Sequence, residues 1–149
     1  VPFGEMPLAG ARVERVRSLL AELTQAGFRG SVEVHTFPGR YCLTGNDSEG
    51  YSLAPDELPY TACDVIGNPA DERQGSSQRQ SLPFASMLAE RRKASDGAFD
   101  IRISSGTADQ TMKSYPELGV DPPHVPGADE WNSAAAANNR VEVRWTRGN

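Results

Sequence analysis

The sequence predicts a mixed α/β (α+β) fold in a single domain, with a small mixed sheet and helices packed on one face of it. Segments with helical spacing of apolar residues alternate along the chain with short segments in which every second residue is apolar. Each predicted strand has one apolar and one polar side, so the sheet is expected to bury only one face. The 149 residues suffice for one such domain with a real core.

The periodic segments set the expected order of elements. In chain order they are a short edge strand at residues 1–4, a helix at 12–26, a strand at 31–36, a helix at about 76–93, a strand at 99–104, a short helix at about 128–137 and a strand at 140–146. The second helix has two alternative starts. Either Ser76 or Ser77 caps it, or Pro83 marks its first turn with Ser81 as the cap.

The last strand is the most regular segment. Val141, Val143 and Trp145 fall on one side of it, and we expect all three, Trp145 included, to belong to the core. Asn138 or Asn139 is expected to adopt the left-handed conformation that ends the preceding helix.

Between about residues 37 and 74 the periodicity disappears, and the segment is rich in Gly, Pro and Asp. So long an irregular stretch is unusual in a compact domain, and we interpret it as an ordered insertion. Cys42 and Cys63 are suited to staple it with a disulfide, which indicates an oxidising compartment; two unpaired thiols are the alternative. Neither histidine stands at ligand spacing from a cysteine, so no metal or cofactor is expected.

Composition excludes several function classes. The net charge of −5 argues against nucleic acid as a partner, because phosphates need a basic surface. No apolar run reaches the length of a membrane span. The chain begins at Val1, so we expect an upstream targeting or anchoring segment outside it. Ser104 and Ser105 lack the context of a nucleophile elbow, and we expect no enzyme.

Two motifs resemble a known family. The segment Asn139-Arg140-Val141-Glu142-Val143 resembles the closing "NRRVEI" strand of the OmpA-like C-terminal domain, a family that binds peptidoglycan in bacterial envelopes. His35 and Thr36 resemble the "GHTD" motif that ends the family's second strand, and Phe37 stands where that motif has its aspartate. The predicted order of elements is also similar to that of the family, so the resemblance implies an OmpA-like two-layer sandwich.

A third motif concerns the second helix. Ser76 and Arg79 keep the serine and arginine of the family's "LSxxRA" pattern; Arg92 is the alternative arginine, but it lies close to the next strand. In the family the aspartate and this arginine grip the diaminopimelate of the peptidoglycan stem peptide, through its ammonium and its carboxylate. Phe37 cannot supply the carboxylate. Substitutes from the insertion are Asp47, Asp64 or Asp71.

The resemblance therefore implies a non-covalent peptidoglycan-binding module of the periplasm or outer membrane, tethered by a segment outside this chain. The implied ligand-binding residues are His35, Thr36, Phe37, Ser76, Arg79, Asn139 and Arg140. One alternative is a fold that has lost this ligand and serves as a protein-interaction module in an envelope assembly. Another is a thiol-dependent hydrolase, which needs a free cysteine beside His35.

Overall fold

Three strands that are distant in the sequence form the central sheet. The structure, a computed structural model, describes residues 1–69, 81–94, 97–107, 109–120 and 123–148. Its elements are α1 (Ala11–Gln25), β1 (Gly30–Phe37), β2 (Tyr41–Asn46), β3 (Gly50–Leu53), the 3-10 turn η1 (Tyr60–Ala62), β4 (Val65–Gly67), α3 (Leu82–Ala94), β5 (Phe99–Ser105), β6 (Gly119–Val120), β7 (Pro123–His124), α4 (Ala128–Asn138) and β8 (Arg140–Arg147). The sheet has the order β5-β1-β8, with β1 parallel to β5 and antiparallel to β8.

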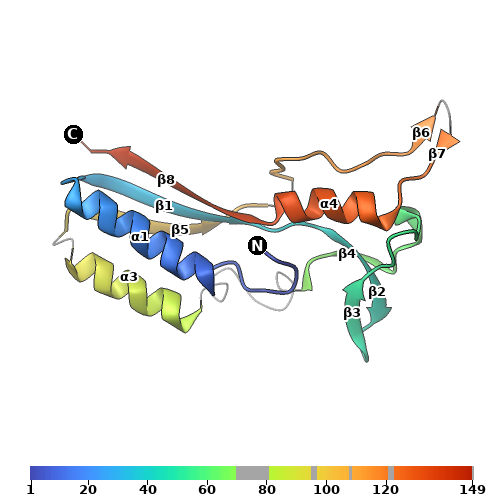
Figure 1. The fold of residues 1–149 in the computed structure, drawn as a ribbon, viewed down its shortest axis with the longest axis horizontal. Helices are drawn as coiled ribbons and strands as arrows, with labels where there is room; N and C mark the ends of the chain where they lie inside the picture. Colours follow the sequence, from blue (N-terminus) through green and yellow to red (C-terminus); the bar gives the residue numbers. More distant parts are fainter. Residues whose placement is uncertain (70–80, 95–96, 108, 121–122, 149) are drawn as a thin grey trace.

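Two helices cover one face of this sheet, which confirms the predicted α+β class. In Figure 1, α1 and α3 lie together on the same side of β1, β5 and β8. The core between these two layers consists of buried apolar residues: Leu8, Val13, Val16, Leu20, Phe28, Val32, Val34, Phe84, Met87, Leu88, Phe99 and Ile101. The strand residues among them alternate with polar neighbours, because successive side chains of a strand point to opposite faces.

Local signals account for the helix boundaries. Gly27 takes a φ of 71°, and Phe28 N donates to Leu23 O at 2.9 Å, so α1 ends where glycine is favoured. Ser81 Oγ accepts a hydrogen bond from Phe84 N at 3.2 Å, and Pro83 lies in the first turn of α3. Of the two predicted starts, the one at Ser81 is therefore confirmed, while Ser76 and Ser77 lie outside the described residues.

A second sheet occupies much of the stretch in which the sequence shows no periodicity. Strands β2, β3 and β4 form it in the order β3-β2-β4, with both pairs antiparallel. The sequence pattern does not reveal these strands, because Tyr41, Cys42 and Leu43 are buried consecutively and show no alternation. Tyr41 and Leu43 pack in one apolar cluster with Ala135 of α4, and Cys42 packs in another with Ala54 and Ala128, so both faces of the strand are covered.

The predicted disulfide is confirmed. Cys42 on β2 is bonded to Cys63, which directly follows η1, and the two Cα atoms are 5.4 Å apart. Cys42 is fully buried, in a small cluster with Ala54 and Ala128. Because both cysteines are bonded, the thiol-dependent hydrolase lacks its free thiol.

Helix α4 belongs to the second sheet and not to the layer formed by α1 and α3, as Figure 1 shows. Asn132 on α4 joins the backbone of β2: its Oδ1 accepts from Cys42 N at 2.7 Å, and its Nδ2 donates to Cys42 O at 3.3 Å. The expectation that the helices share one face is thus correct only for α1 and α3. Strand β8 follows α4 directly and carries the chain back into the central sheet.

Three local expectations were wrong. Residues 1–4 form no strand; Phe3 instead packs edge-to-face on Tyr41, with the ring centroids 4.9 Å apart. Asn139, the C-cap of α4, has φ −80° and ψ 89°, so it is not left-handed, and Asn138 is still helical. Trp145 is 50% exposed, because it lies near the end of an edge strand.

No helix in the described part of the chain is long and apolar enough to cross a membrane.

Candidate functional site at the end of strand β1

The end of β1 and the start of β8 meet where the family resemblance predicts a ligand site. Phe37 and Arg140 are register partners in the antiparallel pair. The Arg140 guanidinium carbon lies 4.2 Å from the centroid of the Phe37 ring, within the range of a cation–π contact. Strand pairing thus brings together two residues that separate sequence motifs had singled out.

The ring of Phe37 is enclosed. Phe37 is only 6% exposed, and the neighbouring His35 ring lies at a centroid distance of 6.1 Å. Gly106 packs so closely on this ring that an added Cβ would overlap it. A glycine is therefore required where the chain leaves β5, and Phe37, which the resemblance aligns with an aspartate, is a covered aromatic ring.

Arg140 is held by several acceptors. Its Nη1 donates to Gln110 O at 3.2 Å and to Asn138 O at 3.0 Å, and its Nη2 lies 3.3 Å from Glu142 Oε2. Its Nε is buried without a hydrogen-bond partner among the described residues. The side chain is 15% exposed, so a ligand carboxylate would reach it by competing with Glu142.

His35 joins two side chains into a short hydrogen-bonded chain. Ser104 Oγ lies 2.6 Å from His35 Nδ1, and Glu33 Oε2 lies 3.2 Å from His35 Nε2. Spacing along the chain does not reveal this link, because the link depends on the parallel register of β1 and β5. Glu33 and His35 alternate with the buried Val32 and Val34, so they lie on the sheet face away from the core, where Ser104 meets the imidazole.

Thr36 and Asn139 are structural in this arrangement. Thr36 is 2% exposed, its Oγ1 donates to Ser105 Oγ at 3.3 Å, and its carbonyl accepts from Gly106 N at 2.7 Å. Asn139 is 4% exposed; its Oδ1 accepts from Gly39 N at 3.2 Å and its Nδ2 donates to Val1 O at 2.9 Å. Both side chains therefore hold backbone segments together at the end of β1.

Asn139 also affects the neighbouring sheet. Burial raises the pKa of the Tyr41 hydroxyl above its ordinary value of 10.0, while a hydrogen bond with Asn139 acts in the opposite direction. Asn68 Nδ2 donates to Asn139 Oδ1 at 3.2 Å and to Gly39 O at 3.1 Å. These buried polar contacts connect the second sheet to the start of β8.

Of the remaining predicted residues, some lie outside the described part of the chain and others, Arg92 among them, lie within it. Ser76, Arg79 and the insertion residue Asp71 lie outside the described residues. Arg92 Nη2 donates to Ile101 O at 3.0 Å, which ties the last turn of α3 to β5 and gives this alternative arginine a structural contact.

Asp47 and Asp64 both serve the β2–β3 hairpin. Asp47 Oδ1 accepts from Tyr51 Oη at 3.1 Å, and Asp64 Oδ2 accepts from Gly45 N at 2.8 Å. In Figure 1 this hairpin projects away from the central sheet, and both carboxylates are engaged by groups of the second sheet.

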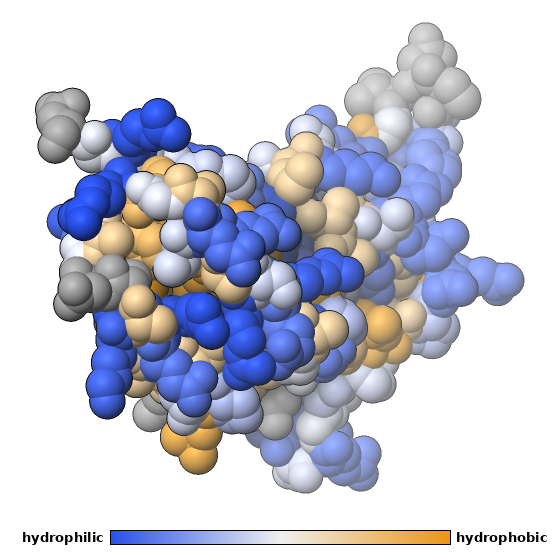
Figure 2. Space-filling model, turned by 60° about the vertical axis from the view of Figure 1, so that its left-hand side comes forward, coloured by the Kyte–Doolittle hydropathy of each residue, from blue (hydrophilic) through white to orange (hydrophobic). Residues whose placement is uncertain are grey.

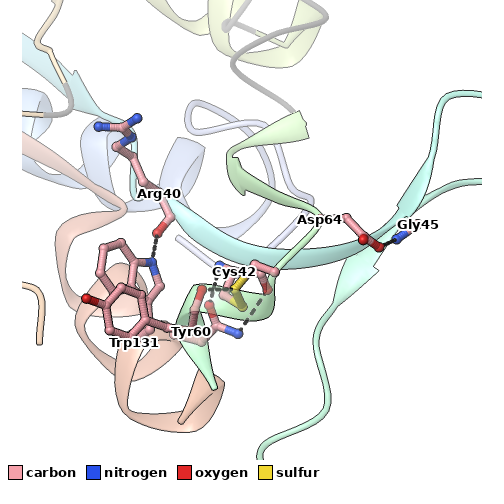
Figure 3. Close-up of a disulfide and its surroundings, with 8 residues drawn as sticks. Arg40, Cys42, Gly45, Tyr60, Asp64 and Trp131 are labelled. Atoms are coloured by element: carbon pink, nitrogen blue, oxygen red, sulfur yellow. Dashed lines mark hydrogen bonds between the residues drawn. A yellow bond between two sulfur atoms is a disulfide. The ribbon is translucent and has the colours of Figure 1, made fainter. Parts of the chain in front are cut away.

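Sequence reasoning missed an aromatic stack beside the disulfide. The Trp131 ring stacks on Tyr60, with centroids 4.9 Å apart, and on Tyr115, at 4.6 Å. Its Nε1 donates to Arg40 O at 2.8 Å, as Figure 3 shows, and Arg40 N donates to Tyr115 Oη at 2.8 Å. Tyr60 comes from the insertion and Tyr115 from the segment between β5 and β6, and only the fold brings the two rings to one tryptophan.

Two hollows accompany these elements. One, of about 410 Å³, lies between residues 113–116 and α4 and carries the charged groups of Lys113, Asp129 and Glu130. The other, of about 310 Å³, is a groove between α1 and β8. Much of the face shown in Figure 2 is hydrophilic, with apolar residues reaching the surface in groups between hydrophilic ones.

Comparison with known proteins finds no match for this chain. No protein-family model, curated protein or solved structure matches the chain. Among the described residues, no group of three or more His, Cys, Asp or Glu side chains is suited to hold a metal ion.

Proposed function

We propose that this chain is a non-covalent binding module for the peptidoglycan stem peptide in the bacterial cell envelope. The observation that carries the proposal is the register pairing of Phe37 with Arg140. The family resemblance picked out the His35–Phe37 segment and the Asn139–Arg140 segment independently, and they are neighbours at one end of the central sheet. The Cys42–Cys63 disulfide is in keeping with an oxidising compartment such as the periplasm.

The ligand chemistry requires one cation and one anion. The guanidinium of Arg79 binds the diaminopimelate carboxylate through a charge-assisted, forked contact. The ammonium needs a carboxylate, which Phe37 lacks. Glu142 supplies it: its side chain is 32% exposed, it pairs with Arg140, and it lies opposite His35 in the strand register.

Calorimetry with a diaminopimelate-containing stem peptide tests this assignment. Arg79→Ala is expected to weaken binding roughly ten- to hundredfold, because it removes one charge-assisted contact. Glu142→Gln is expected to weaken binding as well, and Phe37→Asp to tighten it by adding a second partner for the ammonium. Arg17→Ala is the matched control, because Arg17 is an exposed arginine on α1 that pairs with Glu14. Retention on purified peptidoglycan sacculi is expected to follow the same order.

A second candidate function has an observation in its favour. Phe37 is enclosed by Arg140, His35 and Gly106, as expected if the ligand pocket has been lost. The chain would then act as a protein-interaction module in an envelope assembly. If neither wild type nor Phe37→Asp shows binding heat in the titration with the stem peptide, this function is favoured over peptidoglycan binding.

A further inference from the structure

The outer edge of β8 is an unpaired strand edge in the part of the chain that the structure describes. Strand β8 pairs with β1 and with no other described strand. Natural edge strands are commonly protected by charged side chains, proline or a bulge, because a free row of backbone groups recruits another strand. The segment Val141–Trp145 contains no proline, and its two charged residues, Glu142 and Arg144, have opposite signs.

The alternation of hydrogen-bonded positions along β8 identifies the residues whose backbone groups face the free edge. Gly148 N donates to Arg29 O across the β1–β8 pair. Since bonded positions alternate along an antiparallel pair, Glu142 and Arg144 also bond to β1, and Val141, Val143 and Trp145 turn their N–H and C=O groups to the free edge. The Asn139 carbonyl follows the same alternation: it faces the free edge and accepts a hydrogen bond from the Val1 nitrogen at 2.9 Å.

We propose that a second copy of this chain docks on this edge, with the two β8 strands antiparallel and Val143 opposite Val143 of the second copy. This register uses the outward-facing groups of Val141, Val143 and Trp145 from both copies as its bonded positions. It ends before Asn139, where Val1 already occupies the edge. The two central sheets would join into one, with both helix layers on the same face.

Charge complementarity selects this register. On the polar face it puts Glu142 of each copy opposite Arg144 of the other, so the twofold axis forms two opposite-charge pairs. Within one copy Arg144 lies 3.9 Å from Glu142 and is 65% exposed, so its charge is available to a partner. A parallel pairing in the same alignment would oppose like charges at both positions.

The apolar face offers a complementary fit. Opposite Val141 the register puts the second copy's Trp145, whose side chain is half-exposed in the single chain. Val141 and Val143 line the groove of about 310 Å³ between β8 and α1, together with Val16 and Leu19. An indole docked there would cover apolar surface that a single copy leaves open to water, and its burial would stabilise the dimer.

Sedimentation of the 149-residue chain across a wide micromolar range tests the proposal. We expect a reversible monomer–dimer equilibrium, with a blue shift of tryptophan emission as Trp145 becomes buried. A mass of one chain at every concentration would overturn it. Trp145→Ala is expected to weaken the dimer at least tenfold while leaving the fold intact, because the side chain is half-exposed in the monomer. An unchanged dissociation constant for this variant would also overturn the proposed register.

A charge exchange makes the test specific. Glu142→Arg and Arg144→Glu each oppose like charges at two symmetric positions, so each alone is expected to weaken dimerisation roughly tenfold. Mixed together, the two variants regain opposite-charge pairs at both positions and are expected to form a heterodimer of near wild-type affinity. Such rescue requires both variants to be folded, so a misfolded variant cannot imitate it.

A charge reversal at the opposite edge of the sheet is the control. Arg102→Glu reverses an exposed charge on β5, at the opposite edge of the sheet, and is expected to leave the dimer unchanged. A dimer that persists in both single variants, or a mixture that stays monomeric although circular dichroism shows both chains folded, would refute β8 pairing.

Discussion

Removal of the Cys42–Cys63 disulfide is expected to lower the free energy of unfolding by about 3 kcal/mol. The bond closes a loop with a sequence separation of 21, and in the chain-entropy model the loss arises because the unfolded chain regains the freedom of that loop. Alanine is the appropriate replacement at both positions. Cys42 is fully buried among apolar residues, so serine would add an unpaired hydroxyl and confound the measurement.

Urea unfolding of the Cys42→Ala/Cys63→Ala variant, followed by circular dichroism and by tryptophan fluorescence, measures the loss. Trp131 packs against the cluster that contains Cys42, so its emission reports on the second sheet. Hydrogen exchange adds the location: amides of β2 and β4 are expected to lose more protection than those of β1, since the bond lies in their sheet.

Wild type measured under reducing conditions is the matched control, because it opens the same loop without a change of sequence. It is expected to unfold close to the alanine variant. An alanine variant that unfolds at the wild-type urea midpoint with the same slope would refute the reasoning. The loop would then be equally restricted in the unfolded state with or without the bond.

Three further perturbations test the core and the site. Val34→Asp is expected to destabilise the protein by about 4 kcal/mol or more, because Val34 is fully buried; Arg102→Asp on the exposed face is the control, and thermal melting compares the two. Asn139→Ala leaves the Gly39 N–H without its acceptor and is expected to cost about 1–3 kcal/mol in urea unfolding; a cost near zero would mean that water replaces the amide. Since burial raises the Tyr41 pKa above 10.0, the unfolded chain loses this proton first, and stability is expected to fall as the pH rises past 10.0; Tyr41→Phe should flatten that part of the pH profile of urea midpoints.

Much of the central layer follows from the sequence. The spacing of apolar residues predicted α1, β1, β5 and β8 within one or two residues, because each has one face in the core and one in water. The second sheet did not follow, since β2 is enclosed on both sides and shows no alternation. The disulfide could be predicted because it needs only two cysteines at the ends of one loop.

The site depends on the register of strands, which one-dimensional spacing does not specify. The contact between Phe37 and Arg140 and the link from His35 to Ser104 both arise where β1 pairs with a strand distant in the sequence. The sequence supplied the residue types through a resemblance to known motifs. Only the fold determined which of these side chains are enclosed and which are exposed.

Trp145 illustrates the division most clearly. Alternation along β8 correctly assigned it to the same sheet face as Val143, because that follows from the geometry of a single strand. Whether other elements cover it depends on how many strands and helices lie beside β8. Along the described chain β8 pairs with β1 alone, and the indole remains half-exposed. The sequence determined the direction of the side chain, and tertiary packing determined its burial.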